Sequence, residues 1–485
     1  MLPGTKLDMA LEAPPRPPDI PEARIGPVTQ KELPEAPPMK KIIGPSVILV
    51  GVGIASGEYI LFPYIASQVG LVFLWAAFVG LLTQYFINME IERYTLATGE
   101  TAITGFQRLW RPLGLLMVVC AIVPNMWPAW VISAATITTF LFGGGDANLI
   151  AIIALLVIGI VLSASPVVYQ TIEKLEFVKV ALVLVFLVVA LSAAVTAAGW
   201  SEVDNVATSF GTFPTDQLSW AVLLGALAYA GAGGTNNLVL SNWIRDKGYG
   251  MGHYAPRVVS PLTGKEEAAP AGKGYVFTPD DESLARWRTW WRRANIEQFV
   301  SFFVIGALTI AVFSLVAYST VYQNPAVQED NFDFIQIEGT VLKETVGPWF
   351  GTLFWMIGAI SLFGAALGII DYVSRLVADV LRVGYLRENR RWTESRLYFA
   401  VVWGIIAFGT AILLAGFDQP LTLVVLAAAL SGGVMFIYSM LLIAINRRFM
   451  PRPLKIRGVR LVALCWAVLL FGVMSVIVVI DEAGL

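Results

Sequence analysis

The sequence is poor in the residues that build most catalytic and metal sites. Of its 485 residues, one is a histidine (His253), two are cysteines, and 14% are charged. A single histidine excludes a His-based metal site and a His-dependent catalytic triad. Cys120 and Cys465 lie inside apolar runs, where neither a disulfide framework nor a thiolate metal cluster is expected. The net charge of −2 gives no reason to expect a nucleic-acid partner.

Long apolar runs are what the sequence has in abundance. Hydrophobic residues make up 57% of the chain, and they form runs of about 20 residues, enough to cross a bilayer of roughly 30 Å. We therefore predict an all-α polytopic membrane protein with about eleven transmembrane helices. The predicted spans are 43–68, 71–92, 112–142, 148–170, 176–198, 217–243, 297–320, 347–381, 397–415, 420–446 and 459–480.

The charges of the loops indicate an orientation. If the N-terminus is cytoplasmic, nearly all loop lysines and arginines fall inside, and Lys343 is the only one outside. This pattern satisfies the positive-inside rule with eleven spans and places the C-terminus outside. The N-terminal region has no apolar signal segment. We expect a plasma membrane, most simply a bacterial inner one.

Two stretches lie outside the predicted spans. Residues 1–42 are rich in proline and charge, so we expect a disordered cytosolic tail, with a partner-docking tail as the alternative. The membrane domain fills 43–485 and includes a long cytosolic loop at 246–296. That loop ends in RWRTWWRR at 286–293. This composition suits either a helix on an anionic membrane surface or a linker whose aromatics cap the bundle.

Two predicted spans are interrupted near their middle by small and polar residues. The first reads GVGIASGEYI at 51–60, and the sixth reads YAGAGGTNN at 229–237. Glycine weakens a helix, and freed backbone groups are tolerated in a membrane only where they are buried or line a cavity. The breaks occupy equivalent positions in two five-span halves, 43–198 and 217–446, with 459–480 left over as an extra helix. Paired breaks point to a midplane binding site in an inverted-repeat transporter. Glycine-rich helix packing is the alternative, but it requires neither a glutamate nor paired asparagines.

Ionisable residues inside the spans narrow the site. Glu58 lies in the first break, and a charge at the bilayer centre costs about 2.5–3.5 kcal/mol even on the mildest scale. We expect it to bind a substrate or carry a proton; the alternative is a buried, protonated glutamate bonded to backbone. Asp371 and Arg375 are one turn apart, which suits a structural ion pair, with an ion or proton relay as the alternative.

Polar residues near the breaks complete the predicted site. Asn236 and Asn237 could bind a substrate, or one could cap the second half of the broken helix, and Asn125 is a weaker candidate. The predicted substrate- or ion-binding residues are Ala55, Gly57, Glu58, Gly231, Gly234, Asn236 and Asn237, and the relay candidates are Asp371, Arg375 and Asn125. For a bound metal ion the predicted ligands are Glu58, Asn236 and Asn237.

Several segments resemble the Nramp divalent-metal transporters, over about 43–480. The similar segments are GP at 44–45, QYFINMEIER at 84–93 with TGE at 98–100, KLE at 174–176, NNLVL at 236–240 and RRFMP at 447–451. The resemblance implies a LeuT-like five-plus-five inverted repeat in which spans one and six carry the site. It also implies transport of a small substrate across a lipid bilayer. We expect no cofactor, and no enzymatic activity because no nucleophile–base pair and no zinc motif appears in the spans.

The chain departs from that family at the metal site. The family's Asp-Pro-Gly-Asn is replaced by ASGE at 55–58, and its Met before Pro-His-Asn by Gly234. The family's acids of span three are missing from NMWPAW at 125–130, and its span-ten ligand falls near Ala427 and Ala428. The soft thioether that favours transition metals is therefore absent, and proton coupling through the family's acids is not expected.

Three functions are compatible with these residues. The first is a secondary transporter of a hard divalent cation such as Mg²⁺, or Mn²⁺, because one carboxylate, amide oxygens, free carbonyls and retained waters suit such an ion. The second is a transporter of a small organic amine or amino acid whose ammonium pairs with Glu58. The third is a non-transporting membrane receptor or scaffold that uses the tail and the long loop.

Overall fold

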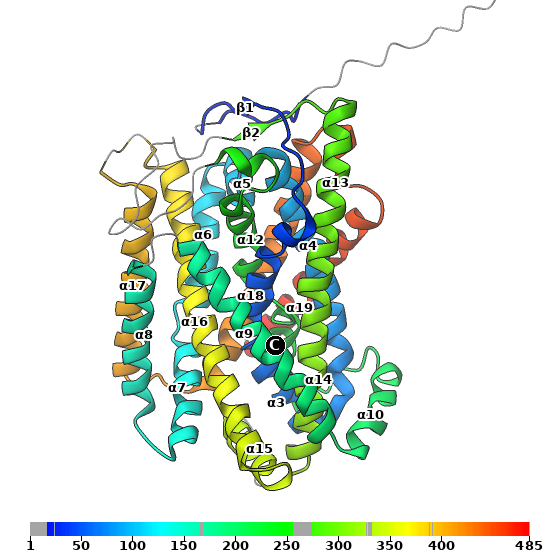
Figure 1. The fold of residues 1–485 in the computed structure, drawn as a ribbon, viewed down its shortest axis with the longest axis vertical. Coiled ribbons are helices and arrows are strands. Elements are labelled where there is room, and N and C mark those ends of the chain that lie inside the picture. Colours follow the sequence, from blue (N-terminus) through cyan, green and yellow to red (C-terminus); the bar gives the residue numbers. More distant parts are fainter. Residues whose placement is uncertain are drawn as a thin grey trace, which may run out of the picture.

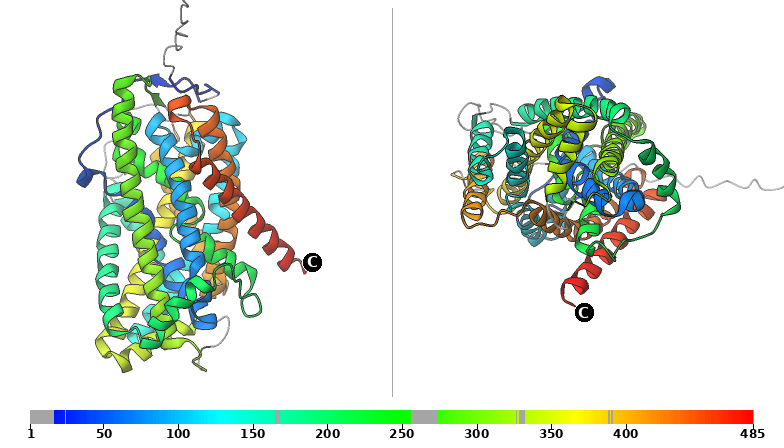
Figure 2. Two further views of the ribbon diagram at one scale, coloured as in Figure 1. Left: turned by 90° about the vertical axis from the view of Figure 1, so that its right-hand side faces the viewer. Right: turned by 90° about the horizontal axis from the view of Figure 1, so that it is seen from below.

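The computed structural model describes residues 17–23, 25–164, 168–255, 274–325, 327, 332–387, 389 and 391–484. They form a bundle of long helices capped at one end by short elements (Figure 1). The capping elements are η3 (Gly250–Tyr254), η5 (Arg452–Leu454) and a two-stranded parallel sheet of β1 (Thr29–Gln30) and β2 (Tyr275–Val276), whereas α1 (Met39–Ile42) lies on the side of the bundle (Figure 2).

The first half of the bundle contains the first broken span. Helix α2 (Pro45–Gly53) stops, and the chain resumes as a π-helical turn, η1 (Gly57–Leu61), that runs into α3 (Phe62–Val69). The helices that follow are η2 (Gly70–Phe73), α4 (Leu74–Thr98), α5 (Ala102–Leu109), α6 (Pro112–Asn125), α7 (Ala129–Phe142), α8 (Ala147–Ala164) and α9 (Val168–Ala193). The predicted third span is two helices, because Pro124 and Pro128 lack the N–H that would continue one helix.

The second half contains the other broken span, α11 (Trp220–Ala228) and α12 (Gly234–Lys247). Its remaining helices are α10 (Ala197–Thr208), α13 (Asp281–Gln298), η4 (Phe299–Val304), α14 (Ile305–Val321), α15 (Asp333–Thr345), α16 (Pro348–Gly384), α17 (Glu394–Leu414), α18 (Pro420–Arg448) and α19 (Val459–Glu482). Figure 1 places α10 and α15 at the end of the bundle opposite β1 and β2, and Figure 2 shows α19 leaning away from the bundle.

The observed helices account for eleven membrane crossings. Nine helical stretches in the described part of the chain are long and apolar enough to span a bilayer. One of them, Pro45–Thr98, has 54 residues, which at 1.5 Å per residue is more than two crossings. The pair α11 and α12 adds the eleventh crossing, since each piece is short on its own. The predicted fold class, an all-α polytopic membrane protein with broken first and sixth spans, is confirmed.

The segment before the first span differs from the disordered tail predicted for 1–42. Residues 17–23 and 25–42 pack against the end of the bundle, with Ile25 and Leu33 buried. Arginine side chains bind its backbone carbonyls: Arg108 reaches Pro21 at 2.6 Å. Proline-rich backbone has few N–H groups of its own to pair, so its order comes from donors on other elements. Residues 1–16 lie outside the described part.

The basic and aromatic stretch 286–293 belongs to α13, which continues into the seventh span. Trp290 is buried, and its indole N–H donates to the carbonyl of Pro34 at 2.7 Å. Arg293 donates to the carbonyl of Ala36 at 2.7 Å. Of the two interpretations of the loop 246–296, these contacts favour the one in which aromatics cap the bundle. Residues 256–273 of the loop lie outside the described part.

Candidate functional site

The two helix breaks are in direct contact with each other. An ideal Cβ atom on Gly53 would lie 1.5 Å from the carbonyl oxygen of Gly231, and one on Gly57 would lie 1.8 Å from that of Tyr229. Neither position therefore accepts a side chain. In the second break Gly231 has a φ of 102°, which also favours glycine. The glycines that interrupt the two spans are what let the breaks meet.

Glu58 lies at this contact. Its side chain has no exposed area, and neither carboxylate oxygen has a hydrogen-bond partner among the described residues. Its Oε1 lies 3.4 Å from the position that a Cβ on Gly53 would take. A buried polar group without a partner costs free energy, which marks it for a ligand or a proton. The backbone N–H groups of Ala55, Glu58 and Gly231 face this carboxyl group, so a glutamate held by neighbouring backbone stays the alternative prediction.

Asn236 and Asn237 stand in the first turn of α12 but face different neighbours. The amide of Asn236 donates back to the carbonyl of Ala232 at 3.4 Å. The amide of Asn237 donates across to Asn88 of α4 at 2.8 Å. The side-chain oxygen of each is buried without a hydrogen-bond partner among the described residues. Each asparagine thus keeps a free acceptor beside the second break.

Gln84 of α4 holds the second break in place, a role that the sequence did not suggest. Its amide nitrogen donates to the carbonyls of Ala228 at 3.0 Å and Ala230 at 2.7 Å. Its oxygen accepts from the backbone N–H groups of Ala232 and Gly233, at 3.1 and 2.9 Å. One side chain therefore satisfies four of the backbone groups that the break frees. An uncharged amide in the middle of an apolar span was the available signal.

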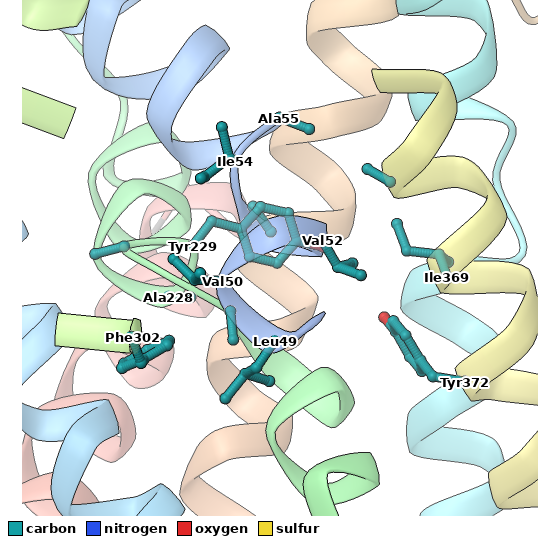
Figure 3. Packing of buried hydrophobic residues seen from close by; sticks show 14 of the residues in the cluster. Leu49, Val50, Val52, Ile54, Ala55, Ala228, Tyr229, Phe302, Ile369 and Tyr372 are labelled. Atoms are coloured by element: carbon teal, nitrogen blue, oxygen red, sulfur yellow. The ribbon is translucent and has the colours of Figure 1, made fainter. Parts of the chain in front are cut away.

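Tyr372 of α16 and Ser431 of α18 lie close to Tyr229, the first residue of the second break (Figure 3). Tyr229 reaches toward the broken first span, near Val52 and Ala55, with Tyr372 of α16 on a facing helix (Figure 3). The hydroxyls of Tyr229 and Ser431 are 3.3 Å apart, and a Cβ on Gly234 would lie 2.6 Å from the Ser431 oxygen. Ser431 thus supplies a polar group of α18 one turn beyond the small residues that the sequence analysis had considered.

Asn125 also belongs to this region. It accepts a hydrogen bond from the hydroxyl of Tyr372 at 2.7 Å and donates to the hydroxyl of Thr235 at 3.4 Å. These bonds join the end of α6 to α16 and to the first turn of α12. All of the predicted binding residues lie on the two breaks or the turns that flank them. Asn125 is joined to the second break by its hydrogen bond to Thr235.

Asp371 and Arg375 belong to a different cluster. Nε of Arg375 lies 2.7 Å from an Asp371 oxygen, which is the i,i+4 ion pair that the spacing suggests. Nη1 of Arg375 lies 2.5 Å from Asp246 of α12, and Tyr398 donates to Asp371 at 2.6 Å. Arg245 adds a pair with Asp379 at 3.0 Å. This network ties α12 to α16 and α17, and its main charges are already paired.

A buried pair on α9 was also missed. Glu176 and Lys179 lie one turn apart, with Lys179 Nζ 2.6 Å from a Glu176 oxygen. In the sequence Glu176 stands out only as part of the KLE segment at 174–176, and Lys179 belongs to no motif. No regular pattern distinguishes a lysine that faces the bundle from one that faces solvent until the neighbouring helices are placed.

The possible metal ligands at the break are mainly oxygen atoms. The described residues contain no group of three or more His, Cys, Asp or Glu side chains able to hold a metal ion. A cation beside Glu58 would have one carboxylate, amide oxygens such as that of Asn236, backbone carbonyls and water. Hard cations take such oxygen ligands.

The fold has solved counterparts. No protein-family model and no curated protein sequence matches the chain. Crystal structures of a manganese transporter of Eremococcus coleocola match with a TM-score of 0.63 and 13% identity, over 96% of this chain and 90% of that one. The same transporter bound to an aromatic bis-isothiourea compound matches with a TM-score of 0.60 and the same identity and coverage. At this identity the likeness establishes the fold, and the chain is a multi-pass membrane protein with the fold of that transporter.

Proposed function

We propose that this chain is a secondary transporter, a divergent relative of the Nramp proteins, that carries a hard divalent cation, most simply Mg²⁺. The observation that carries the proposal is the carboxylate of Glu58, enclosed between the two helix breaks with both oxygens unpartnered. A cation that binds there would gain a charged ligand that is hydrogen-bonded to no side chain among the described residues.

The ligand set favours a hard ion over a soft one. The nearby acceptors are the free oxygens of Asn236 and Asn237 and the carbonyls of the breaks. Gly234 stands where the related transporters have a methionine, so the break supplies no thioether at that position. Oxygen ligands with retained water suit Mg²⁺, and Mn²⁺ is the nearest transition metal in this respect.

The contact between the breaks also favours a small substrate. Gly53 and Gly57 lie against backbone carbonyls, and Glu58 is fully enclosed. An amino acid would have to separate the two helices to reach Glu58, and an ion would have to separate them less.

Two layers would alternate in closing the site. Toward β1 and β2 lies the Arg375 network, which ties α12 to α16. Toward α15 lies an aromatic group around Tyr59, whose ring centroid is 5.2 Å from that of Phe313 and 5.1 Å from that of Phe354. Rocking of one set of spans around a fixed midplane site would open one layer at a time. The loop charges favour a cytoplasmic β1–β2 end in a plasma membrane.

Uptake into proteoliposomes tests the proposal. Mg²⁺, Mn²⁺ and Ca²⁺ are offered in turn to the wild type, to Glu58→Gln and to a matched control, Glu92→Gln, which alters a buried carboxylate on α4. We expect saturable uptake that is strongest for Mg²⁺. Glu58→Gln should reduce this uptake about a hundred-fold, and the control should keep it.

Absence of flux for all three ions, in vesicles that hold folded protein, would contradict the cation proposal. Uptake of a small amine that depends on Glu58 in those same vesicles would then support the organic-solute alternative. Equal uptake by wild type and Glu58→Gln would remove Glu58 from the site.

A further inference from the structure

The pair formed by Glu176 and Lys179 is buried inside the membrane bundle. Their side chains are 1% and 5% exposed, and the contact of 2.6 Å is an ion pair. Beyond this pairing, the Lys179 nitrogen and the facing Glu176 oxygen have no hydrogen-bond partner among the described residues. Burying an ammonium in a membrane span costs free energy, and residues that bear this cost are usually functional. Lys179 bears it with a single contact.

Two glycines make the space for this pair. An ideal Cβ on Gly51 of α2 would lie 2.3 Å from the Glu176 oxygen, and one on Gly364 of α16 would lie 3.0 Å from the Lys179 nitrogen. The pair therefore sits between α9, the first half of the broken span and α16. Gly51 is two residues before Gly53, whose neighbours are Gly231 and Glu58.

The charge of Lys179 reaches the site. Gly51, which faces the pair, and Gly53, which faces Glu58, stand two residues apart on α2, so the ammonium lies near enough for its charge to act on the Glu58 carboxylate. The lysine side chain is a flexible four-carbon stem with a compact charge at its tip. Such a stem is what a change of partner between two carboxylates requires when the backbone stays fixed in α9.

We propose that Lys179 is an internal cation that competes with the substrate for Glu58. It pairs with Glu176 while a cation occupies Glu58, and it moves toward Glu58 when the cation leaves. This inference rests on the proposed function. It gives the empty carrier a way to neutralise a carboxylate that would otherwise be buried without a counter-charge, at a large cost in free energy.

The two members of the pair then have opposite effects on substrate affinity. In Lys179→Met the competitor is gone, so we expect Mg²⁺ to bind about ten-fold more tightly. In Glu176→Gln the lysine has only Glu58 to pair with, so we expect Mg²⁺ to bind about ten-fold more weakly. A pair with only a structural role would shift both variants in the same direction, because either change leaves one buried charge unpaired.

Calorimetric titration of the purified full-length chain with Mg²⁺ measures these shifts. Opposite signs support the proposal, and shifts of the same sign or no shift overturn it. If Lys179→Met does not yield folded protein, Glu176→Gln is compared with the double variant Glu176→Gln/Lys179→Met. These two differ only in the lysine, and the double variant should bind Mg²⁺ more tightly.

A stability cycle without any divalent cation separates this inference from the proposed function. The melting temperatures of Glu58→Gln, Lys179→Met and their double variant are compared with a control cycle that uses Lys343→Met, a change on α15. Non-additive effects for Lys179 and additive effects for Lys343 support the interaction with Glu58, even if no Mg²⁺ binds and the proposed function fails. Additive effects in both cycles overturn the inference.

Discussion

Asp371 and Glu58 are both acidic residues inside predicted membrane spans, but the structure gives them different partners. Asp371 is paired with Arg375, which also reaches Asp246. Glu58 is as deeply buried, yet both of its oxygens lack a hydrogen-bond partner among the described residues. A buried charge with its partners supplied braces the helices, whereas one without them is prepared for something that arrives. Burial alone would not have separated the two.

The largest expected effect is the loss of transport in Glu58→Gln. If Glu58 is the charged ligand, its neutralisation should reduce Mg²⁺ uptake about a hundred-fold, which corresponds to about 3 kcal/mol of binding. The fold should not suffer, because the change removes an unpartnered buried charge. Uptake in proteoliposomes measures the loss of transport, and the melting temperature in detergent shows whether the fold is unchanged. A variant that transports normally, or fails only because it unfolds, would erase the contrast with Asp371.

Arg375→Met should have the opposite profile, with its primary effect on stability. It leaves Asp371 and Asp246 without their main counter-charge, and breaking a buried ion pair costs about 3–5 kcal/mol. The free energy of unfolding in mixed detergent measures this loss. Arg288→Met, an exposed position on α13, is the matched control and should change stability by less than about 0.5 kcal/mol. Similar values for the two arginines would contradict the bracing role.

Gln84→Leu tests how the second break is held. It removes the partner of four backbone groups, at Ala228, Ala230, Ala232 and Gly233. We expect a loss of about 2–3 kcal/mol, since each buried group left unpaired carries a desolvation penalty. Gln68→Leu is the comparison, because the Gln68 amide donates to its neighbour Ser67 at the end of α3. Equal losses in an unfolding titration would show that the break is held by other contacts.

The smallest expected effect is that of Glu338→Gln. This variant tests whether every buried carboxylate without a hydrogen-bond partner belongs to the substrate site. Glu338 of α15 is buried, and neither of its oxygens has a hydrogen-bond partner among the described residues. Burial raises the pKa of Glu338 well above its usual range. The folded protein then holds this proton more tightly than the unfolded chain, so stability falls as the pH rises through the raised pKa.

The Glu338→Gln variant should therefore be more stable than the wild type at pH 8, by about 1–2 kcal/mol, with a smaller difference at pH 5. Unfolding curves at both pH values measure it. Glu344→Gln, an exposed position on the same helix, is the control and should show no such difference. Mg²⁺ uptake should be retained, because Glu338 stands on α15 and belongs to neither of the two breaks. Loss of uptake would extend the site to α15.

The sequence predicted the architecture better than the contacts inside it. The apolar runs located the eleven spans, and the glycines of 51–60 and 229–237 located both breaks, because the physics that interrupts a helix is local. Glu58 could be identified because a charge inside a span is conspicuous. The role of Gln84 could not, since its partners come from a helix that lies about 145 residues further along the chain.

Order in the N-terminal segment escaped prediction for a similar reason. Composition describes what residues 17–42 can do for themselves, whereas their carbonyls are held by Arg108, Trp290 and Arg293 from other elements. The partnership between Lys179 and the site likewise depends on which face of α9 meets α2. Substrate binding by the predicted residues stays a prediction.

Anomalous scattering from crystals grown with Mn²⁺, which takes oxygen ligands as Mg²⁺ does, tests the central claim most directly. The account predicts one peak inside the bundle, at coordinating distance from a Glu58 oxygen and close to the Asn236 oxygen, and no peak there in Glu58→Gln crystals. A peak confined to the protein surface, or one inside the bundle that persists in Glu58→Gln, would contradict it.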